Sequence, residues 1–219
     1  MFEKKTMSDY IYHEIKDAIV FLEYEPGEKL SEVQLAQKFD VSRSPVRAAL
    51  AILERDGLVI IKPQSGTIVS EISFKRARDM QQIRCLLEPY AARLAAPHIT
   101  DGRLADLQMR FDKLARLPPR SEEKRLFVTV VDMMMHDLIL EYCGNKEIER
   151  IIKSFRPIMQ RVNDANTHRA SRLISTEKEM REIFENLKKR DAQGAYEAMV
   201  NHMSNTHIRP TKLDKKKEE

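Results

Sequence analysis

Two arginines that stand four residues apart, the first of them between two serines, are the first side chains in this sequence that could do chemistry. They lie in the segment VSRSPVR, residues 41–47. Arg43 and Arg47 share one face if the segment is helical, because residues i and i+4 are neighbours on a helix surface. An arginine fork matches the O6 and N7 atoms of guanine, or a phosphate, and the hydroxyls of Ser42 and Ser44 can bind phosphate beside a helix N-terminus. The pattern predicts DNA contacts, the alternative being a solvated arginine face.

A second pair, Asp132 and His136, has the same spacing of four. On a helix the two side chains would lie one above the other, which suits two ligands of one metal ion. The same spacing also suits a buried, hydrogen-bonded pair without a metal. The three methionines between them, residues 133–135, are most simply core residues of a buried helix.

Composition and cysteine spacing exclude several classes of protein. Of the 219 residues, 42% are hydrophobic and 33% are charged, which is ordinary for a globular protein and rules out global disorder. No apolar run approaches the roughly 20 residues of a membrane span, and the start, MFEKKTMSDY, lacks the apolar core of a secretion signal. We therefore expect a cytoplasmic protein that does not enter a membrane. Cys85 and Cys143 form no CxxC pair, which excludes a cysteine zinc site.

The elements that must position the arginines follow a recognisable order. Apolar periodicity predicts three helices and Pro/Gly signals predict a hairpin after them, at about 8–24, 32–39, 42–56 and 58–72. Helix, short helix, turn, helix and hairpin is the order of a winged helix-turn-helix. Gln64 and Gly66 lie in the loop of the hairpin, where glycine lets the backbone approach the minor groove.

After residue 72 only helical patterns remain, so the fold is predicted to be mostly α. Six helices are expected, at about 74–97, 101–117, 121–143, 146–165, 172–190 and 192–207. They are enough for an all-α domain with its own core and a small pocket. The predicted domains are 1–72 for DNA binding and 73–210 for effector binding and dimerisation, followed by a disordered tail at 211–219.

Charge permits a nucleic-acid partner without requiring one. The chain has a formal net charge of +4, whereas residues 1–70 hold nine Lys and Arg and eleven Asp and Glu. Because that segment is net acidic, DNA binding would need a locally sorted basic face.

Residues 8–72 closely resemble the GntR family of bacterial regulators. The family pattern is PGxxLSExxLAxxxGVSRTPVRxALxxLxxxGLV, and the sequence keeps most of it from Pro26 to Leu58, including VSRSPVR. The resemblance implies that the two arginines contact an operator. Two positions depart from the pattern, because Val33 stands where an arginine is usual and Ala48 where a glutamate is usual.

Residues 74–207 resemble the FCD domain of FadR-type GntR regulators. The matching stretches are RCLLE followed by AARLAA (84–96), DMMMH followed by GN (132–145), and a last stretch from Glu179 to His202. Six helices rather than seven favour the VanR-like branch of that subfamily. The resemblance implies a ligand-responsive transcriptional regulator rather than an enzyme, expected as a homodimer on a palindromic double-stranded operator and as a repressor released by a small organic acid.

The FCD resemblance also implies a divalent metal held by one aspartate and three histidines. The matching residues are Asp132, His136, Met180 and His202. A thioether does not replace imidazole for zinc, nickel or manganese, so one ligand is missing. His98 and His207 are the remaining candidates for the fourth place.

Arg84 matches a family arginine that faces the effector pocket, where a forked cation could clamp a carboxylate. The alternative is a salt bridge on the helix surface, with Glu88, four residues later on the same helix, as the candidate partner. Pro89 is expected to kink this helix. Two other functions stay open for the whole chain: a helical metal-dependent enzyme that uses Asp132, His136 and His202, and a DNA-binding protein whose sensor domain has decayed.

Overall fold

The structure, a computed structural model, describes residues 6–63, 65–119, 121–166 and 170–206, and the side chains of 163–166 and 170–174 are outside that description. Contacts divide the chain into two compact units. The first contains residues 1–77 together with 154–166, and the second contains 78–153 and 167–209. The predicted domain limits stay a prediction. Gln64, His207 and the tail at 211–219, which we expected to be disordered, lie outside the described residues.

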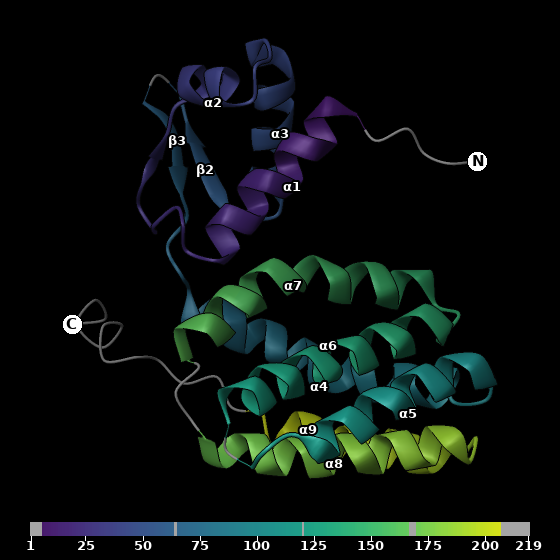
Figure 1. Ribbon diagram of the computed structural model, residues 1–219. Helices are drawn as coiled ribbons and strands as arrows, with labels where there is room; N and C mark the ends of the chain where they lie inside the picture. The colour runs from purple at the N-terminus through teal and green to yellow at the C-terminus, as the bar shows by residue number, and fades with distance from the viewer. Residues whose placement is uncertain (1–5, 64, 120, 167–169, 207–219) are drawn as a thin grey trace. The chain divides into compact units, whose positions relative to one another are not determined.

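The first unit places three helices against a small antiparallel sheet (Figure 1). The helices are α1 (Met7–Val20), α2 (Glu32–Lys38) and α3 (Arg43–Arg55), and the strands are β1 (Lys29–Leu30), β2 (Val59–Lys62) and β3 (Gly66–Val69). The strand order is β1-β3-β2. The apolar stripes of α1 and α3 meet in a core that contains Ile11, Ile15, Ile19, Val46, Leu50 and Leu53. The predicted winged helix-turn-helix is confirmed.

Two details of this unit differ from the expected elements. The first helix ends at Val20 rather than near residue 24, because Leu22 adopts a left-handed backbone conformation with φ of 61°. The strand β1 was not predicted, since two residues carry no periodicity. Its place is decided by pairing with β3, where Lys29 lies opposite Ile68.

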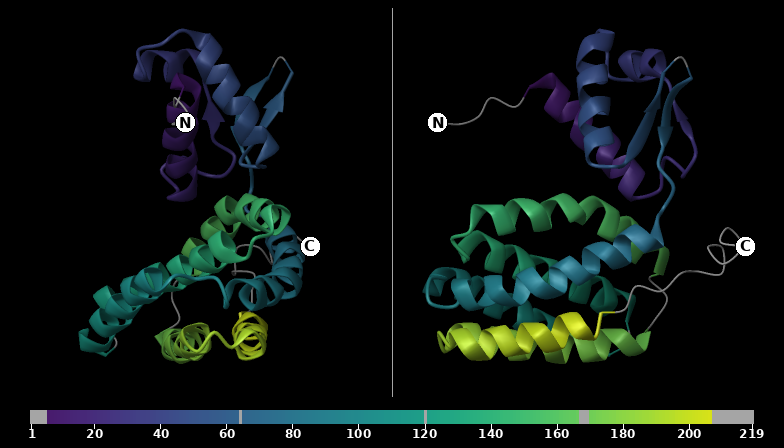
Figure 2. Two further views of the ribbon diagram at one scale, coloured as in Figure 1. Left: turned by 90° about the vertical axis from the view of Figure 1, so that its right-hand side faces the viewer. Right: turned by 180° about the vertical axis from the view of Figure 1, so that it is seen from behind.

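In the described ranges after residue 72, six helices follow, as predicted. They are α4 (Phe74–Ala95), α5 (Asp101–Arg116), α6 (Glu122–Tyr142), α7 (Lys146–Asn166), α8 (Ala170–Lys188) and α9 (Ala192–Ser204). Helix α4 continues through Pro89. In the second unit α8 and α9 pack side by side, and α6 contacts both α5 and α8 (Figure 2). None of the helices in the described ranges is long and apolar enough to cross a membrane.

The core of the second unit lies along one face of α6. Val131, Met135 and Ile139 are buried there, and the rings of Phe111 and Phe184 pack 5.0 Å apart between α5 and α8. The expectation that the whole methionine run fills the core is wrong, because Met133 and Met134 are 41% and 36% exposed. Successive helical residues point about 100° apart, so three neighbours do not share one buried face.

Candidate functional site

The N-terminal end of α3 presents the predicted DNA-contacting side chains to solvent. Ser42 is the N-cap residue and makes no capping hydrogen bond with its hydroxyl. Arg43, Ser44 and Arg47 are exposed, while Val46, Ala49, Leu50 and Leu53 bury the opposite face of the helix. The amphipathic pattern of α3 therefore sets the direction of both arginines.

Arg47 has a partner that the sequence did not indicate. Its guanidinium donates to Glu32 at the start of α2, with Nη2 2.9 Å from Oε2, and the side chain of Arg47 is 69% exposed. The hydrogen bond from Arg47 lowers the pKa of Glu32. Acidic residues are common in the first turn of a helix because they interact favourably with the helix dipole. The presence of Glu32 there therefore did not indicate that it pairs with Arg47, 15 residues later.

A hollow of about 550 Å³ is lined both by Arg47 and by the wing, which is the hairpin formed by β2 and β3. Its lining includes Arg47, Lys29, Lys62 and Gly66. Gly66 has φ of +93° and nothing within 4 Å of the place where a Cβ would be, so the backbone conformation, rather than space, requires glycine here. Val33, 41% exposed on α2, lines a shallower hollow with Ser42 and Arg43, so the departure from the family pattern adjoins the predicted contacts.

Asp132, His136 and His202 converge in the second unit, although 66 residues separate the two histidines. Asp132 and His136 come from α6 and His202 from α9. Nε2 of His136 lies 3.3 Å from Nε2 of His202. Oδ1 of Asp132 lies 3.3 Å from Nε2 of His202 and 3.9 Å from Nε2 of His136. We call these three residues the triad.

Both histidines of the triad are buried, whereas Asp132 is half-buried. His136 and His202 are 7% and 3% exposed. Oδ1 of Asp132 is buried and makes no hydrogen bond of acceptable geometry. Burial raises the pKa of Asp132, but contact with His202 and the charges of both histidines lower it further, so the net direction is down. One carboxylate oxygen and two imidazole nitrogens within 4.8 Å fit a divalent metal such as zinc, nickel or manganese.

Two buried glutamates lie behind the histidines. Oε2 of Glu88, on α4, is in direct contact with Nδ1 of His136, off the ideal hydrogen-bond direction. Oε2 of Glu179, on α8, lies 3.0 Å from Nδ1 of His202. Burial alone would raise the pKa of Glu88, but His136 and Arg84 lower it to about 2. Burial by itself would lower the pKa of His136, but the neighbouring Glu88 carboxylate has the larger effect, so the pKa of His136 is raised. Sequence reasoning did not assign either glutamate to the site.

Arg84 pairs with Glu88, the partner that the alternative interpretation named, but the pair is largely buried rather than on the helix surface. Its Nε donates to Oε1 of Glu88, and Nη1 lies 3.3 Å from Oε1 of Gln81. The side chain of Arg84 is only 17% exposed. Its guanidinium therefore belongs to the network around the triad, and the role of an effector clamp stays a prediction.

Met180 packs in the core and takes no place in the triad. It is fully buried on α8 together with Ile183, Phe184 and Leu187. His98, one candidate for the fourth ligand, is exposed in the turn between α4 and α5. In the part of the chain that the structure describes, this cluster therefore has three donors.

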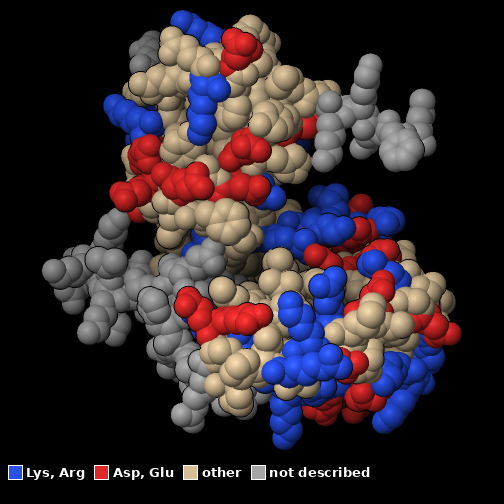
Figure 3. Space-filling model, viewed as in Figure 1, with Lys and Arg blue, Asp and Glu red and all other residues tan. Residues whose placement is uncertain are grey.

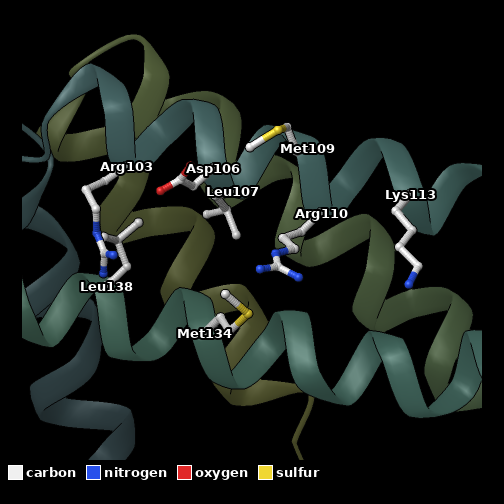
Figure 4. Close-up of a pocket in the computed structure, with 8 residues that line it drawn as sticks. All are labelled: Arg103, Asp106, Leu107, Met109, Arg110, Lys113, Met134 and Leu138. Atoms are coloured by element: carbon white, nitrogen blue, oxygen red, sulfur yellow. The ribbon is translucent and has the colours of Figure 1, made fainter.

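A separate hollow of about 500 Å³ lies between α5 and α6. Figure 4 shows the Arg110 guanidinium directed toward Met134 and that of Arg103 beside Leu138. Lys and Arg side chains gather over α5 on the face that Figure 3 shows. No triad residue lines this hollow, so it is distinct from the candidate metal site.

Comparison with known proteins gives two matches to family models. The FCD domain matches residues 79–205, and the family described as bacterial regulatory proteins, gntR family, matches residues 7–69. Among curated relatives, the HTH-type transcriptional regulator YdhC of Bacillus subtilis is 26% identical over 88% of this chain and 86% of its own length. The HTH-type transcriptional repressor RspR of Escherichia coli is 28% identical over 90% of this chain and 86% of its own length.

Solved structures agree with the fold. Escherichia coli McbR/YncC has a TM-score of 0.69 at 21% identity and covers 91% of this chain and 94% of its own. A GntR regulator from Rhodococcus sp. RHA1 has a TM-score of 0.68 at 20% identity, with 90% and 94% covered.

Proposed function

Because the chain belongs to the gntR family of bacterial regulatory proteins and carries an FCD domain, it is a ligand-responsive DNA-binding transcriptional regulator and not an enzyme, and we propose that it is a repressor whose effector binds at a divalent metal. The observation that carries the proposal is the convergence of Asp132, His136 and His202 in the FCD domain. The protein would act in the cytoplasm, where operator DNA lies.

The DNA part of the proposal rests on the exposed end of α3. Ser42, Arg43, Ser44 and Arg47 would enter the major groove, and Gly66 of the wing would approach the minor groove, with Gln64 beside it. Two copies of the chain would read the two halves of a palindrome, since the half-sites of such proteins are about one helical turn, roughly 34–36 Å, apart. We infer a homodimer for that reason.

The sensor part rests on the missing fourth ligand. Three protein donors leave coordination positions open, and a small carboxylate can occupy them. A bound metal would supply a positive charge that fixes the carboxylate, while the triad holds the metal. We also propose the VanR-like branch of FadR-type regulators, which is supported by the six helices, α4 to α9, that follow the DNA-binding part in the described residues.

The test combines elemental analysis with operator binding. Untagged protein would be purified with Zn²⁺, Ni²⁺ or Mn²⁺, and its metal content compared with that of His136→Ala. We expect metal in the wild-type protein and none in the variant. Small carboxylates should then release the operator from the metal-loaded protein only. Equal metal content in wild type and His136→Ala would contradict the proposal that the triad holds the metal. If no carboxylate changes operator binding, the result would favour a DNA-binding protein with a decayed sensor domain.

A further inference from the structure

Each histidine of the triad meets a buried carboxylate with the ring nitrogen that faces away from Asp132. Nδ1 of His136 contacts Oε2 of Glu88, and Nδ1 of His202 lies 3.0 Å from Oε2 of Glu179. Glu88 is 1% exposed and Glu179 is 7% exposed. The two carboxylates come from different helices, α4 and α8, yet both contact Nδ1 of a ring, Glu179 with hydrogen-bond geometry and Glu88 off the ideal direction.

The second oxygen of each carboxylate is held by an anchor. Arg84 Nε donates to Oε1 of Glu88, and Asn205 Nδ2 donates to Oε1 of Glu179 at 3.0 Å. A buried carboxylate is costly unless its oxygens have partners, and here both oxygens of each group have one. The anchors therefore fix the direction in which each carboxylate presents its other oxygen to a histidine.

An ionised carboxylate only accepts hydrogen bonds, and a neutral imidazole has one N–H. The carboxylates favour that proton on Nδ1, which leaves the lone pair on Nε2. Both Nε2 atoms lie within 4 Å of Oδ1 of Asp132. The opposite tautomer would turn an Nε2–H toward Asp132 and form a closed hydrogen-bonded pair that cannot ligate a metal. The protonation of the outer nitrogen thus decides which of the two arrangements the triad takes.

We propose that Glu88 and Glu179 are positioning residues that keep Nδ1 of His136 and His202 protonated and so reserve both Nε2 atoms for a divalent metal. The inference rests on the proposed metal site and adds the residues that make it ready for a metal. Carboxylates behind metal-ligating histidines raise metal affinity about 10–100-fold. Arg84 then acts as the anchor of Glu88.

Glu179 gives the sharper test because its partner Asn205 is exposed and neutral. In Glu179→Leu the acceptor is lost and much of the volume is kept, whereas Glu179→Gln keeps an acceptor oxygen. Glu177→Leu is the matched control, since Glu177 lies on the same helix and pairs with Lys124, away from the triad. All variants are full-length chains.

The first measurement is the ¹⁵N–¹H correlation spectrum of the histidine rings in metal-free protein. We expect the proton of His202 on Nδ1 in the wild type, in Glu179→Gln and in Glu177→Leu, and a shift toward Nε2 in Glu179→Leu. A purely structural role of Glu179 would not move the tautomer. The matching spectrum of Glu88→Leu reports on His136, whose proton should likewise shift from Nδ1 toward Nε2.

The second measurement is the affinity for Ni²⁺ and Zn²⁺ in competition with a chelator. Glu179→Leu should bind each metal about 10–100-fold more weakly, Glu179→Gln should lose less, and Glu177→Leu should match the wild type. Should Glu179→Leu not fold, Asn205→Ala removes the anchor alone and should lower the affinity in the same direction, by a smaller factor.

The proposal is overturned if Glu179→Leu keeps both the Nδ1 proton of His202 and wild-type affinity. Its failure is distinguishable from that of the metal site itself. If neither wild type nor His136→Ala binds metal, the metal part of the proposed function fails. The positioning role of Glu88 and Glu179 is then overturned as well, because it presupposes a metal at the triad. If wild type binds metal and the carboxylate variants bind it equally well, only the positioning role fails.

Discussion

At the scale of single residues, the candidate site in each of the two units depends on a few oriented side chains. Arg47 is held by Glu32 at the surface of the first unit, and the histidines are held by glutamates in the interior of the second. In both places the group that would do the chemistry contacts a carboxylate. The exposed pair contributes little stability by itself, because solvent screens it.

Arg47→Ala should weaken operator binding by about 1–3 kcal/mol, the usual value of a bidentate contact with a base. Arg55→Ala is a matched control, since Arg55 is exposed at the far end of the same helix. Titration of operator DNA at one salt concentration measures both variants. If Arg47→Ala and Arg55→Ala lose the same amount, Arg47 contributes only charge and does not read a base.

Met180→His should restore the fourth ligand that the FCD pattern provides. The position is fully buried among apolar side chains, so the ring must displace neighbours before it can reach the metal. Where the packing allows that, we expect retention of metal through dialysis that empties the wild type. Elemental analysis of the two proteins, purified side by side, measures the difference. A histidine variant that folds and stays as empty as the wild type would argue against a metal at the triad.

At the scale of elements, α6 serves two surfaces at once. One face of this helix carries Asp132 and His136 toward α9, while another lines the hollow against α5 with Met134 and Leu138. Helix α9 completes the triad because its buried face, with Ala195, Met199 and Met203, packs on α8 in the same unit. The candidate metal site thus depends on the rotation of α6 and α9 about their own axes.

Substitutions of Met133 and Met135, two residues apart on α6, test the rotation of this helix about its axis. Met135→Ala should lower the free energy of unfolding by about 2–5 kcal/mol, because it opens a cavity at a fully buried position. Met133→Ala should change it by less than about 0.5 kcal/mol, because this side chain is 41% exposed. Chemical denaturation of both variants compares them. Equal losses would mean that α6 is rotated differently about its axis.

At the scale of the whole molecule, a monomer presents one recognition helix and a palindrome needs two. We expect a homodimer of about 51 kDa, twice the 25.6 kDa of one chain. Sedimentation at micromolar concentration measures the mass. A monomer under these conditions would require that operator DNA itself brings the two copies together.

Much of the fold could be predicted from the sequence because helices and hairpins follow from local patterns. Apolar spacing, Pro45 in the first turn of α3 and Gly57 at its end placed the helices within a few residues of their observed limits. The short strand β1 had no such signal, and only its partner β3 defines it. The exposed directions of Arg43 and Arg47 also followed from the sequence, since the buried face of their own helix determines them.

The sequence by itself determined the regulator family, the order of the elements and the three donors of the triad, the last through resemblance to a known pattern. Only the tertiary structure decided that Glu88 and Glu179 contact the outer ring nitrogens of the two histidines and that Met180 is a core residue, whereas the pairing of Arg84 with Glu88 within α4 was one of two roles that the sequence left open. The physical reason is that these contacts are made between different helices, because Glu88 of α4 meets His136 of α6 and Glu179 of α8 meets His202 of α9. Helix periodicity fixes which residues share a face, whereas the packing of the whole bundle fixes what that face meets.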